Sequence, residues 1–479
     1  MFEALWNSGW PHLIWVGILY AVGIAHVVHA LMHVRTSQGT VAWVVSLMSV
    51  PFVAIPLYWL LGRTRFSHDI GGRRARDERL AKLTTDMERR LRDLEVEIPG
   101  DNGFERAAEI LGGLPFTRGN DLRVLIDGKD AFERIFRAIE RSTDYICVNF
   151  FIVKNDRLGK RFQQALIDRA RDGVRVYFLF DEFGSHKLPG HYLQEMRDAG
   201  IECHSFGVNR FWWSRLQINF RNHRKVVIAD GDVAFIGGLN VGDEYLGRSQ
   251  RFGPWRDTHL EMKGPVVQAV QRVFLEDWYW AAYELPELSW DSGEQEADQV
   301  AAIIPTGPAD PAESWQLLVA EAANTARKRL WITSPYFVPD SGVMTALQAA
   351  AIRGVDVRIL IPEHPDHHLV WLSAFAYYPS SIPYGVRIFR YTRGFLHQKV
   401  MLIDDRHATV GTANLDNRSF RLNFEITAFS PDWKFVDRIS EMLNEDFSHA
   451  REVKLEEFTK RPFLFRAACR AARLFAPIQ

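Results

Sequence analysis

The sequence has few cysteines and no excess of either charge, and each absence excludes a class of protein. The three cysteines, Cys147, Cys203 and Cys469, are far apart and form no CxxC pair, so neither a disulfide framework nor a zinc knuckle is predicted. Lys and Arg number 58 against 59 Asp and Glu, which argues against a protein that mainly coats nucleic acid. The sequence also lacks a Gly-x4-Gly-Lys-[Ser/Thr] loop, so no nucleotide is expected to drive its chemistry.

Long apolar runs are present at the N-terminus. Leu13–Val34 and Val41–Leu61 contain no Asp, Glu, Lys or Arg, and about 20 helical residues cross a hydrocarbon core of ~30 Å. The short connection between them predicts an antiparallel hairpin of two transmembrane spans within residues 1–62. A cleaved signal peptide is the rival interpretation of the first run, but only Glu3 precedes it as a charged residue and a second run follows at once.

Arginines next to these runs predict the orientation. One arginine, Arg35, lies between the runs, whereas five follow the second run: Arg63, Arg65, Arg73, Arg74 and Arg76. The positive-inside rule therefore places the large C-terminal part in the cytoplasm. The same cluster would contact anionic headgroups of the membrane surface.

A repeated order of helices and strands begins near Leu122. Helices are expected at 131–142 and 161–172 with strands at 145–153 and 174–180, and the order returns as helices at 315–327 and 344–353 with strands at 330–338 and 355–361. This predicts an α/β fold in which two repeats, each a mixed, mostly parallel sheet flanked by helices, form one pseudo-symmetric unit. The expected boundaries are a basic and amphipathic linker at 63–121, repeat 1 at 122–297, repeat 2 at 298–455, and a basic amphipathic segment at 456–479.

Two amphipathic segments leave alternatives open. Leu80, Leu83, Met87, Leu91 and Leu94 recur at helical spacing, which favours a connector helix over a short coiled-coil seam. In the C-terminal segment, Arg466, Arg470 and Arg473 occupy one side, and Phe463, Ala467, Ala471 and Leu474 the other. Binding to a membrane surface and packing on the globular part of the chain are equally consistent with that pattern.

A duplicated motif carries the chemistry. His-x-Lys-x4-Asp followed by Gly-x-x-Asn occurs as His223, Lys225, Asp230, Gly237 and Asn240, and again as His397, Lys399, Asp404, Gly411 and Asn414. The apolar runs after each lysine indicate buried strands, on which residues i and i+2 face the same way. Each histidine should therefore point with its lysine into one cavity, while the aspartates begin turns.

These side chains suit a reaction at phosphorus. A neutral imidazole is a nucleophile near neutral pH, and a second, protonated imidazole can give a proton to a departing alkoxide. Lys225, Lys399, Asn240 and Asn414 would hold the phosphate oxygens and oppose their charge. No metal or other cofactor is then required.

The double motif resembles the phospholipase D superfamily, and the surrounding sequence is similar to bacterial cardiolipin synthases of the two-span type. The stretches that carry this similarity begin at Asn222, Gly237, Trp255, Ser334 and Gly411 and end with Asn423-Phe-Glu. The resemblance implies an enzyme of the bacterial inner membrane that joins two phosphatidylglycerol molecules into cardiolipin and glycerol through a phosphohistidine. Phosphatidylethanolamine is an alternative donor. Oligomeric state stays open.

The resemblance also assigns roles. It favours His223 as nucleophile and His397 as general acid and then base, although the residues themselves leave that order open. Glu425 resembles the family carboxylate that orients a catalytic histidine, and Asp257 is the weaker candidate for the other histidine. Thr412 stands where many family members have Ser, and Gly238 occupies the matching place in the first half.

Other clusters invite weaker hypotheses. His26, His29 and His33 are interpreted as a polar stripe facing the hairpin partner, and His364, His367 and His368 as a loop near the pocket mouth, each in preference to a metal site. Phe211, Trp212 and Trp213 beside two arginines suit an interfacial loop, or equally the core. The functional alternatives to a transferase are a phospholipase D-type hydrolase acting on phospholipid, a nuclease, which the membrane runs disfavour, and a non-catalytic membrane scaffold.

Overall fold

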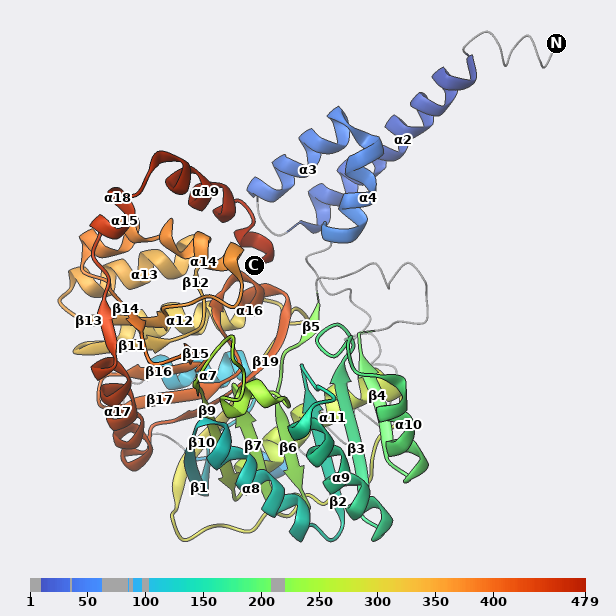
Figure 1. Cartoon of the computed structure of the whole chain (residues 1–479), viewed down its shortest axis with the longest axis vertical. Helices are drawn as coiled ribbons and strands as arrows, with labels where there is room; N and C mark the ends of the chain where they lie inside the picture. The colour runs from blue at the N-terminus through green and yellow to red at the C-terminus, as the bar shows by residue number, and fades with distance from the viewer. Residues whose placement is uncertain (1–9, 35–36, 63–84, 86–88, 97–102, 208–219) are drawn as a thin grey trace. The chain divides into compact units, whose positions relative to one another are not determined.

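A computed structural model describes residues 10–34, 37–62, 85, 89–96, 103–207 and 220–479. Contacts divide the chain into two compact units, Met1–Ile70 with Val208–Phe220, and Gly71–Gly207 with Arg221–Gln479. Within the described residues, the first unit consists of three apolar helices and the second is an α/β body (Figure 1). The predicted loop at Phe211–Trp213 and the Arg63–Arg76 cluster lie outside the described residues, as does most of the predicted helix at 80–94.

The helical unit contains one helix long and apolar enough to cross a membrane. This helix is α2 (Trp10–His33). Its segment Ile14–His33 has 20 residues and a mean hydropathy of 1.9. The second apolar run is divided into α3 (Ser37–Ser49) and α4 (Pro51–Leu61). Val50 leaves helical geometry at φ −140° and ψ 62°, because a proline disfavours the α conformation in the residue before it. The structure thus gives one candidate span and does not show the predicted hairpin of two.

The α/β body contains two copies of one succession of elements. The first copy comprises β1 (Thr117–Ile126), α8 (Asp127–Arg141), β2 (Tyr145–Phe150), α9 (Arg157–Arg171), β3 (Arg175–Asp181), α10 (Gly190–Asp198), β4 (Glu202–Phe206), β6 (Val226–Ala229), β7 (Val233–Gly237), β9 (Thr258–Lys263) and α11 (Val266–Ala282). The second comprises β10 (Gln299–Thr306), α12 (Ser314–Thr325), β11 (Arg329–Thr333), α13 (Ser341–Ile352), β13 (Asp356–Pro362), α14 (His368–Phe375), β14 (Arg387–Tyr391), β16 (Val400–Ile403), β17 (His407–Gly411), β19 (Asn423–Ser430) and α17 (Trp433–Ser448). The predicted duplication of helices and strands is confirmed.

One continuous sheet joins the two copies. Its order is β20-β14-β13-β11-β16-β17-β19-β10-β1-β9-β7-β6-β2-β3-β4, with the halves meeting where β1 and β10 pair antiparallel. The sheet is mixed as predicted, but the expectation that it is mostly parallel is wrong. In each half only the β2-β3-β4 or β11-β13-β14 part is parallel. The motif strands are followed by tight turns, and a tight turn can join only antiparallel neighbours, as in β6-β7 and β16-β17.

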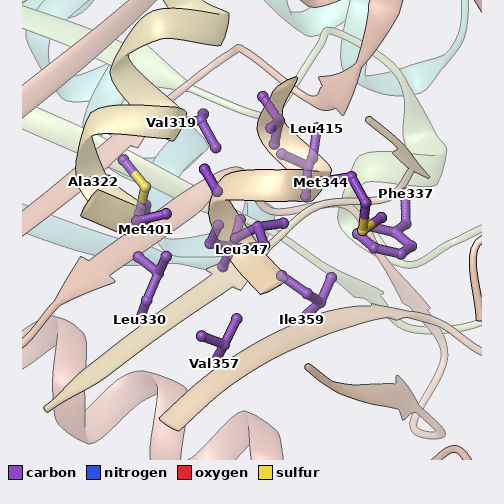
Figure 2. Close-up of a cluster of buried hydrophobic side chains, with 14 of the residues drawn as sticks. Val319, Ala322, Leu330, Phe337, Met344, Leu347, Val357, Ile359, Met401 and Leu415 are labelled. Atoms are coloured by element: carbon purple, nitrogen blue, oxygen red, sulfur yellow. The ribbon is translucent and has the colours of Figure 1, made fainter. Parts of the chain in front are cut away.

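Helices cover each half of the sheet and enclose two apolar cores. In the second half, Val319, Leu330, Leu347 and Ile359 are almost completely buried between α12, α13 and the strands (Figure 2). A similar core in the first half contains Phe132, Ile146, Phe162 and Phe178. Truncating one such side chain to Ala typically costs about 2–5 kcal/mol, so these cores hold the strands that carry the motifs.

The C-terminal helix α19 (Phe463–Arg473) has two apolar faces. Cys469 and Ala472 are buried, and Phe465 packs edge-on against Phe375 of α14 with ring centroids 5.3 Å apart. Phe463, Leu464 and Leu474 are exposed, and two of these belong to the apolar side expected from the sequence. The helix therefore packs on the α/β body through one face and leaves the predicted apolar face outside the core.

The remaining described elements connect these layers. They are α7 (Gly103–Gly112), β5 (Arg221–Asn222), η2 (Asp243–Leu246), β8 (Trp255–Arg256), β12 (Phe337–Val338), α15 (Tyr378–Ser381), η3 (Ile382–Tyr384), β15 (Phe395–Leu396), β18 (Leu415–Asp416), α16 (Asn417–Arg421), β20 (Ala450–Glu452), α18 (Glu456–Thr459) and η4 (Ala476–Ile478). Two of them, β5 and β15, are short strands immediately before the motifs, and each pairs with a strand of the other half.

Candidate active site

The two His-x-Lys motifs lie just before β6 and β16 rather than within these strands. The apolar residues of β6 and β16 are buried in the sheet, which anchors the extended segments that precede them. The amide of His223 donates to Phe424 O at 2.9 Å, and the amide of His397 donates to Arg256 O at 2.8 Å. Each motif is thus bonded through its backbone to the opposite half of the molecule.

A carboxylate from the opposite half also contacts each imidazole. His223 Nδ1 lies 2.8 Å from Glu425 Oε2, and His397 Nδ1 lies 2.8 Å from Asp257 Oδ2. Both carboxylates are fully buried, while each histidine side chain is about 10% exposed. A carboxylate that holds Nδ1 leaves Nε2 as the reactive nitrogen and sets the orientation of the ring. Glu425 and Asp257, the two residues expected to orient histidines, are therefore in contact with them.

The two carboxylates are supported differently. Glu425 accepts hydrogen bonds from Thr412 Oγ1 at 2.6 Å, Ser419 Oγ at 2.8 Å and Asn423 Nδ2 at 3.2 Å. Asp257 accepts from the Thr258 amide at 2.9 Å and from Trp255 Nε1 at 3.3 Å.

The different supports of Glu425 and Asp257 explain why Thr412 and Gly238 differ from the Ser that many family members have at the first of these positions. Thr412 keeps the hydroxyl and donates it to Glu425. A Cβ at Gly238 would overlap the Asp257 carboxylate, so the first half accommodates its carboxylate by omitting a side chain there.

Burial governs the protonation of the histidines. Desolvation lowers the pKa of His223 to about 4 despite the neighbouring Glu425, and desolvation together with Lys399 lowers the pKa of His397. Burial alone would raise the pKa of Glu425, but His223 and Lys225 bring it below its usual value. Both imidazoles are therefore neutral at neutral pH, the state in which an imidazole can act as a nucleophile.

The lysines lie against the histidines. Lys399 Nζ is 2.9 Å from His397 Nδ1 and 3.0 Å from Nε2, and Lys225 Nζ donates to His223 O at 2.5 Å. Desolvation lowers the pKa of Lys399 to about 8 and that of Lys225 well below its ordinary value. The positive charge of Lys399 also disfavours protonation of His223, which links the two motifs electrostatically.

The motif aspartates bind backbone rather than facing the histidines. Asp230 accepts from the amides of Thr143, Asp144 and Tyr145 at 2.8–2.9 Å, and Asp404 accepts from those of Arg327, Lys328 and Arg329 at 2.7–3.1 Å. Both have positive φ, 57° and 53°, as a tight turn after a strand demands. Each aspartate thereby ties the motif turn to the start of the adjacent strand, β2 or β11, which runs antiparallel to the motif strand.

The two asparagines differ. Asn240 donates to Tyr245 OH at 3.0 Å and accepts from the Ile152 amide at 3.0 Å, so both ends of its amide have a protein partner. The side-chain oxygen of Asn414 is buried and has no partner among the described residues.

A second layer of polar residues supports the motifs and was not predicted from the sequence. Asp277 of α11 accepts from Asn222 at 2.9 Å and from Arg224 at 2.5 Å. Asp446 of α17 plays the same part in the other half, accepting from Gln398 and Arg256. Two sequence features could have predicted this layer. A polar residue, Arg224 or Gln398, lies between the His and the Lys of each motif, and each half has one acidic residue on its final helix that pairs with it.

The other predicted clusters have the following positions. In the helical unit, His26 Nε2 accepts from Trp59 at 2.6 Å and His29 Nδ1 lies 2.7 Å from Tyr58 OH. Asp366 accepts from Tyr336 OH at 2.5 Å just before α14, and the neighbouring His367 is exposed. Within the described part of the chain, no three His, Cys, Asp or Glu side chains gather as a metal-binding group.

Comparison with known proteins agrees with this geometry. The fold resembles the crystal structure of phosphatidylserine synthase from Haemophilus influenzae Rd KW20, with a TM-score of 0.62 over 78% of this chain and all of that one at 16% identity. Residues 135–278 and 319–447 match the family described as cardiolipin synthase, PLD-like domain. Fold and paired motifs thus define a phospholipase D-like protein.

Curated relatives narrow the class. The chain is 44% identical over 469 residues to cardiolipin synthase A of Pseudomonas putida strain F1, covering 97% of each protein. It is 42% identical over 473 residues to cardiolipin synthase A of Pseudomonas fluorescens strain Pf-5, covering 98% of this chain and 99% of that protein. The chain belongs to the cardiolipin synthase family of phospholipase D-like enzymes.

Proposed function

We propose that this enzyme makes cardiolipin by transferring a phosphatidyl group from one phosphatidylglycerol to another and releasing glycerol. The observation that carries the proposal is the crossed arrangement at the junction of the halves. Each half supplies a His-Lys pair and the carboxylate that orients the histidine of the other half. A site of this kind presents two Nε2 atoms and two ammonium groups to one phosphodiester.

In the first step, Nε2 of His223 attacks phosphorus and the bond to the glycerol oxygen breaks. His397, protonated once the anionic phosphate raises its pKa, gives its proton to that oxygen as glycerol leaves. The low pKa of His223, about 4, supports its role as the nucleophile. Glu425 stabilises the positive charge that the imidazole ring gains.

In the second step, the hydroxyl of another phosphatidylglycerol gives its proton to His397 and attacks phosphorus. The P–N bond to His223 breaks and cardiolipin is released. One phosphodiester replaces another, so the exchange needs no nucleotide. Lys225 and Lys399, together with Asn240 and Asn414, hold the phosphate oxygens in this proposal and oppose the charge that develops on them.

The enzyme is proposed to act at the bacterial inner membrane, with the α/β body on the cytoplasmic side. Support comes from α2, the candidate span, and from the arginines that follow the apolar helices in the sequence. Repeat 1 is taken as 122–297 and repeat 2 as 298–455, with 456–479 as an appended C-terminal segment. The substrates are then lipids of the bilayer that holds the enzyme.

The test is to incubate the purified protein with phosphatidylglycerol in liposomes and to identify the products by mass spectrometry. Cardiolipin and free glycerol in equal amounts are expected. Phosphatidic acid as the main product would replace the transferase by a hydrolase on the same site. His223→Ala and His397→Ala are each expected to lose activity at least 1000-fold, and full activity in either would refute the two-histidine mechanism.

A further inference from the structure

The three helices of the N-terminal unit do not have the arrangement of a two-span hairpin. α3 has 13 residues and α4 has 11, so they are ~20 Å and ~16 Å long at 1.5 Å per residue. Neither alone crosses a hydrocarbon core of ~30 Å. A second crossing would require the two helices to run end to end.

The contacts between α3 and α4 exclude that arrangement. The rings of Trp43 in α3 and Tyr58 in α4 lie 5.0 Å apart. In one straight helix these residues would be separated by ~22 Å along the axis, which two side chains cannot bridge. The chain therefore reverses direction at Val50 and Pro51.

Contacts with α2 give the direction of the returning helix. A Cβ at Gly23 would lie 3.6 Å from Pro51 Cβ and 3.1 Å from Leu47 O, so the turn is packed against Gly23. Further along α2, His26 bonds Trp59 and His29 bonds Tyr58. The chain thus returns along α4 toward the end of α2 from which α3 set out, and α3 and α4 lie beside the second half of α2 (Figure 1).

The outer surface of this helical pair is apolar. Val41, Val45, Phe52 and Val53 are all exposed, which suits lipid rather than water. Backbone groups at the turn are largely satisfied, because the amides of Val50, Val53 and Ala54 donate to carbonyls at 2.9–3.1 Å and Pro51 has no amide hydrogen. Such a turn is tolerated inside a membrane when it packs on another helix.

The distribution of charge agrees with one crossing. Ahead of α2 the sequence contains only Glu3 as a charged residue, while Arg35 and the five arginines from Arg63 to Arg76 all follow it. With two crossings, Arg35 would lie on the side opposite the arginine cluster. With one crossing, every arginine near the membrane falls on the same side, as the positive-inside rule favours.

We infer that α2 alone crosses the bilayer and that α3 and α4 form a re-entrant pair, inserted from and returning to the side of the α/β body. The N-terminus then lies on the opposite, external face of the membrane. This inference rests on the membrane anchorage and not on the chemistry proposed above.

Single cysteines in the full chain test it, since the native Cys147, Cys203 and Cys469 are all buried. Ser8→Cys reports the N-terminus, Ser37→Cys the start of α3, and Lys160→Cys the exposed surface of the α/β body. A membrane-impermeant maleimide is applied to right-side-out spheroplasts and to inside-out vesicles. We expect Ser8→Cys to react in spheroplasts, and Ser37→Cys and Lys160→Cys to react in inside-out vesicles.

A two-span hairpin gives the inverse pattern for the first two positions. Ser8→Cys and Lys160→Cys would then both be labelled by the maleimide in inside-out vesicles, and Ser37→Cys would be labelled in spheroplasts. This result would overturn the inference. Ser49→Cys, at the end of α3, should react only after detergent is added; labelling without detergent would refute insertion of the pair. The expected labelling without cardiolipin formation in the same membranes would refute the proposed function and leave the topology intact.

Discussion

At the scale of single residues, the crossed contacts explain why two copies of a motif make one site. Each histidine is held by a carboxylate that belongs to the other half, so neither half contains a complete histidine–carboxylate pair. The halves have nonetheless diverged in how that carboxylate is held. This divergence makes the two sides experimentally distinguishable.

We expect Thr412→Val to lower cardiolipin synthesis about 10-fold, because it removes a buried donor to Glu425 and leaves the shape unchanged; an unsatisfied buried polar group costs about 1–3 kcal/mol. Thr412→Ser restores the hydroxyl and should restore activity. The measurement is the initial rate in liposomes. Equal rates for the Val and Ser variants would show that this hydrogen bond does not support His223.

Gly238→Ala should be more damaging, with a loss of at least 100-fold, because its methyl group would displace Asp257 from His397. Gly242→Ala is a matched control, because a methyl group there would lie near Lys154 and Glu244 and not near the Asp257 carboxylate. Activity of the Gly238→Ala enzyme is compared with its thermal unfolding temperature. A rate close to that of the unaltered enzyme would contradict the close packing of Gly238 on Asp257.

The pH dependence of the rate should report Lys399. Its pKa is lowered to about 8, so the ammonium that opposes phosphate charge is present below that pH and lost as the pH rises through it. We expect kcat/KM to fall on the alkaline side of about pH 8. Lys399→Arg, which stays charged, should remove this decline even if its maximum rate is lower, and a profile unchanged in shape would assign the decline to another group.

At the scale of elements, the motif aspartates join turns to strands. Asp404 receives three backbone amides from the residues that lead into β11, and Asp230 does the same before β2. The same contacts occur in both halves, which indicates that the two aspartates stabilise the fold rather than contact the substrate.

Asp404→Asn is expected to destabilise the fold by about 2 kcal/mol, since hydrogen bonds to a charged acceptor are each worth about 1.5–3 kcal/mol and only part of their strength is lost. Asn tolerates the positive φ of this position. The thermal unfolding temperature should fall, while kcat of the folded enzyme stays within about twofold. A large fall in kcat without a change in stability would instead indicate that Asp404 acts in catalysis.

At the scale of the whole molecule, one sheet runs through both halves. The central β1-β10 pair and the contacts of β5 with β19 and of β8 with β15 all join one half to the other. The covalent connection between the halves, by contrast, is an acidic segment in which Asp291, Gly293 and Glu294 are exposed.

A protease site inserted after Gly293 should therefore be cleavable without loss of function. We expect the two fragments to copurify and to keep at least half of the cardiolipin synthase activity, because the sheet and the crossed site hold them together. Activity and copurification are measured before and after cleavage. Separation of the fragments under non-denaturing conditions would show that the β1-β10 pairing is too weak to hold the halves.

Prediction from the sequence succeeded where structure depends on local pattern. Spacing alone predicted that His223 and His397 lie beside their lysines, and the periodicity of apolar residues located helices and strands such as α8, β2, α12 and β11. It failed at the direction of strand pairing, since the parallel βαβ pattern was extended to strands that a short turn makes antiparallel. It also treated 41–61 as one helix although Pro51 interrupts it.

The amino-acid sequence by itself predicted the reacting groups and the lipid setting, because a duplicated motif and long uncharged runs are properties of residue order. Only the tertiary structure decided which carboxylate serves which histidine, since Glu425 is 202 positions from His223 in the chain and yet lies 2.8 Å from it. It likewise decided that α4 folds back beside α2. Both outcomes depend on contacts between segments far apart in sequence, and no local pattern encodes such contacts.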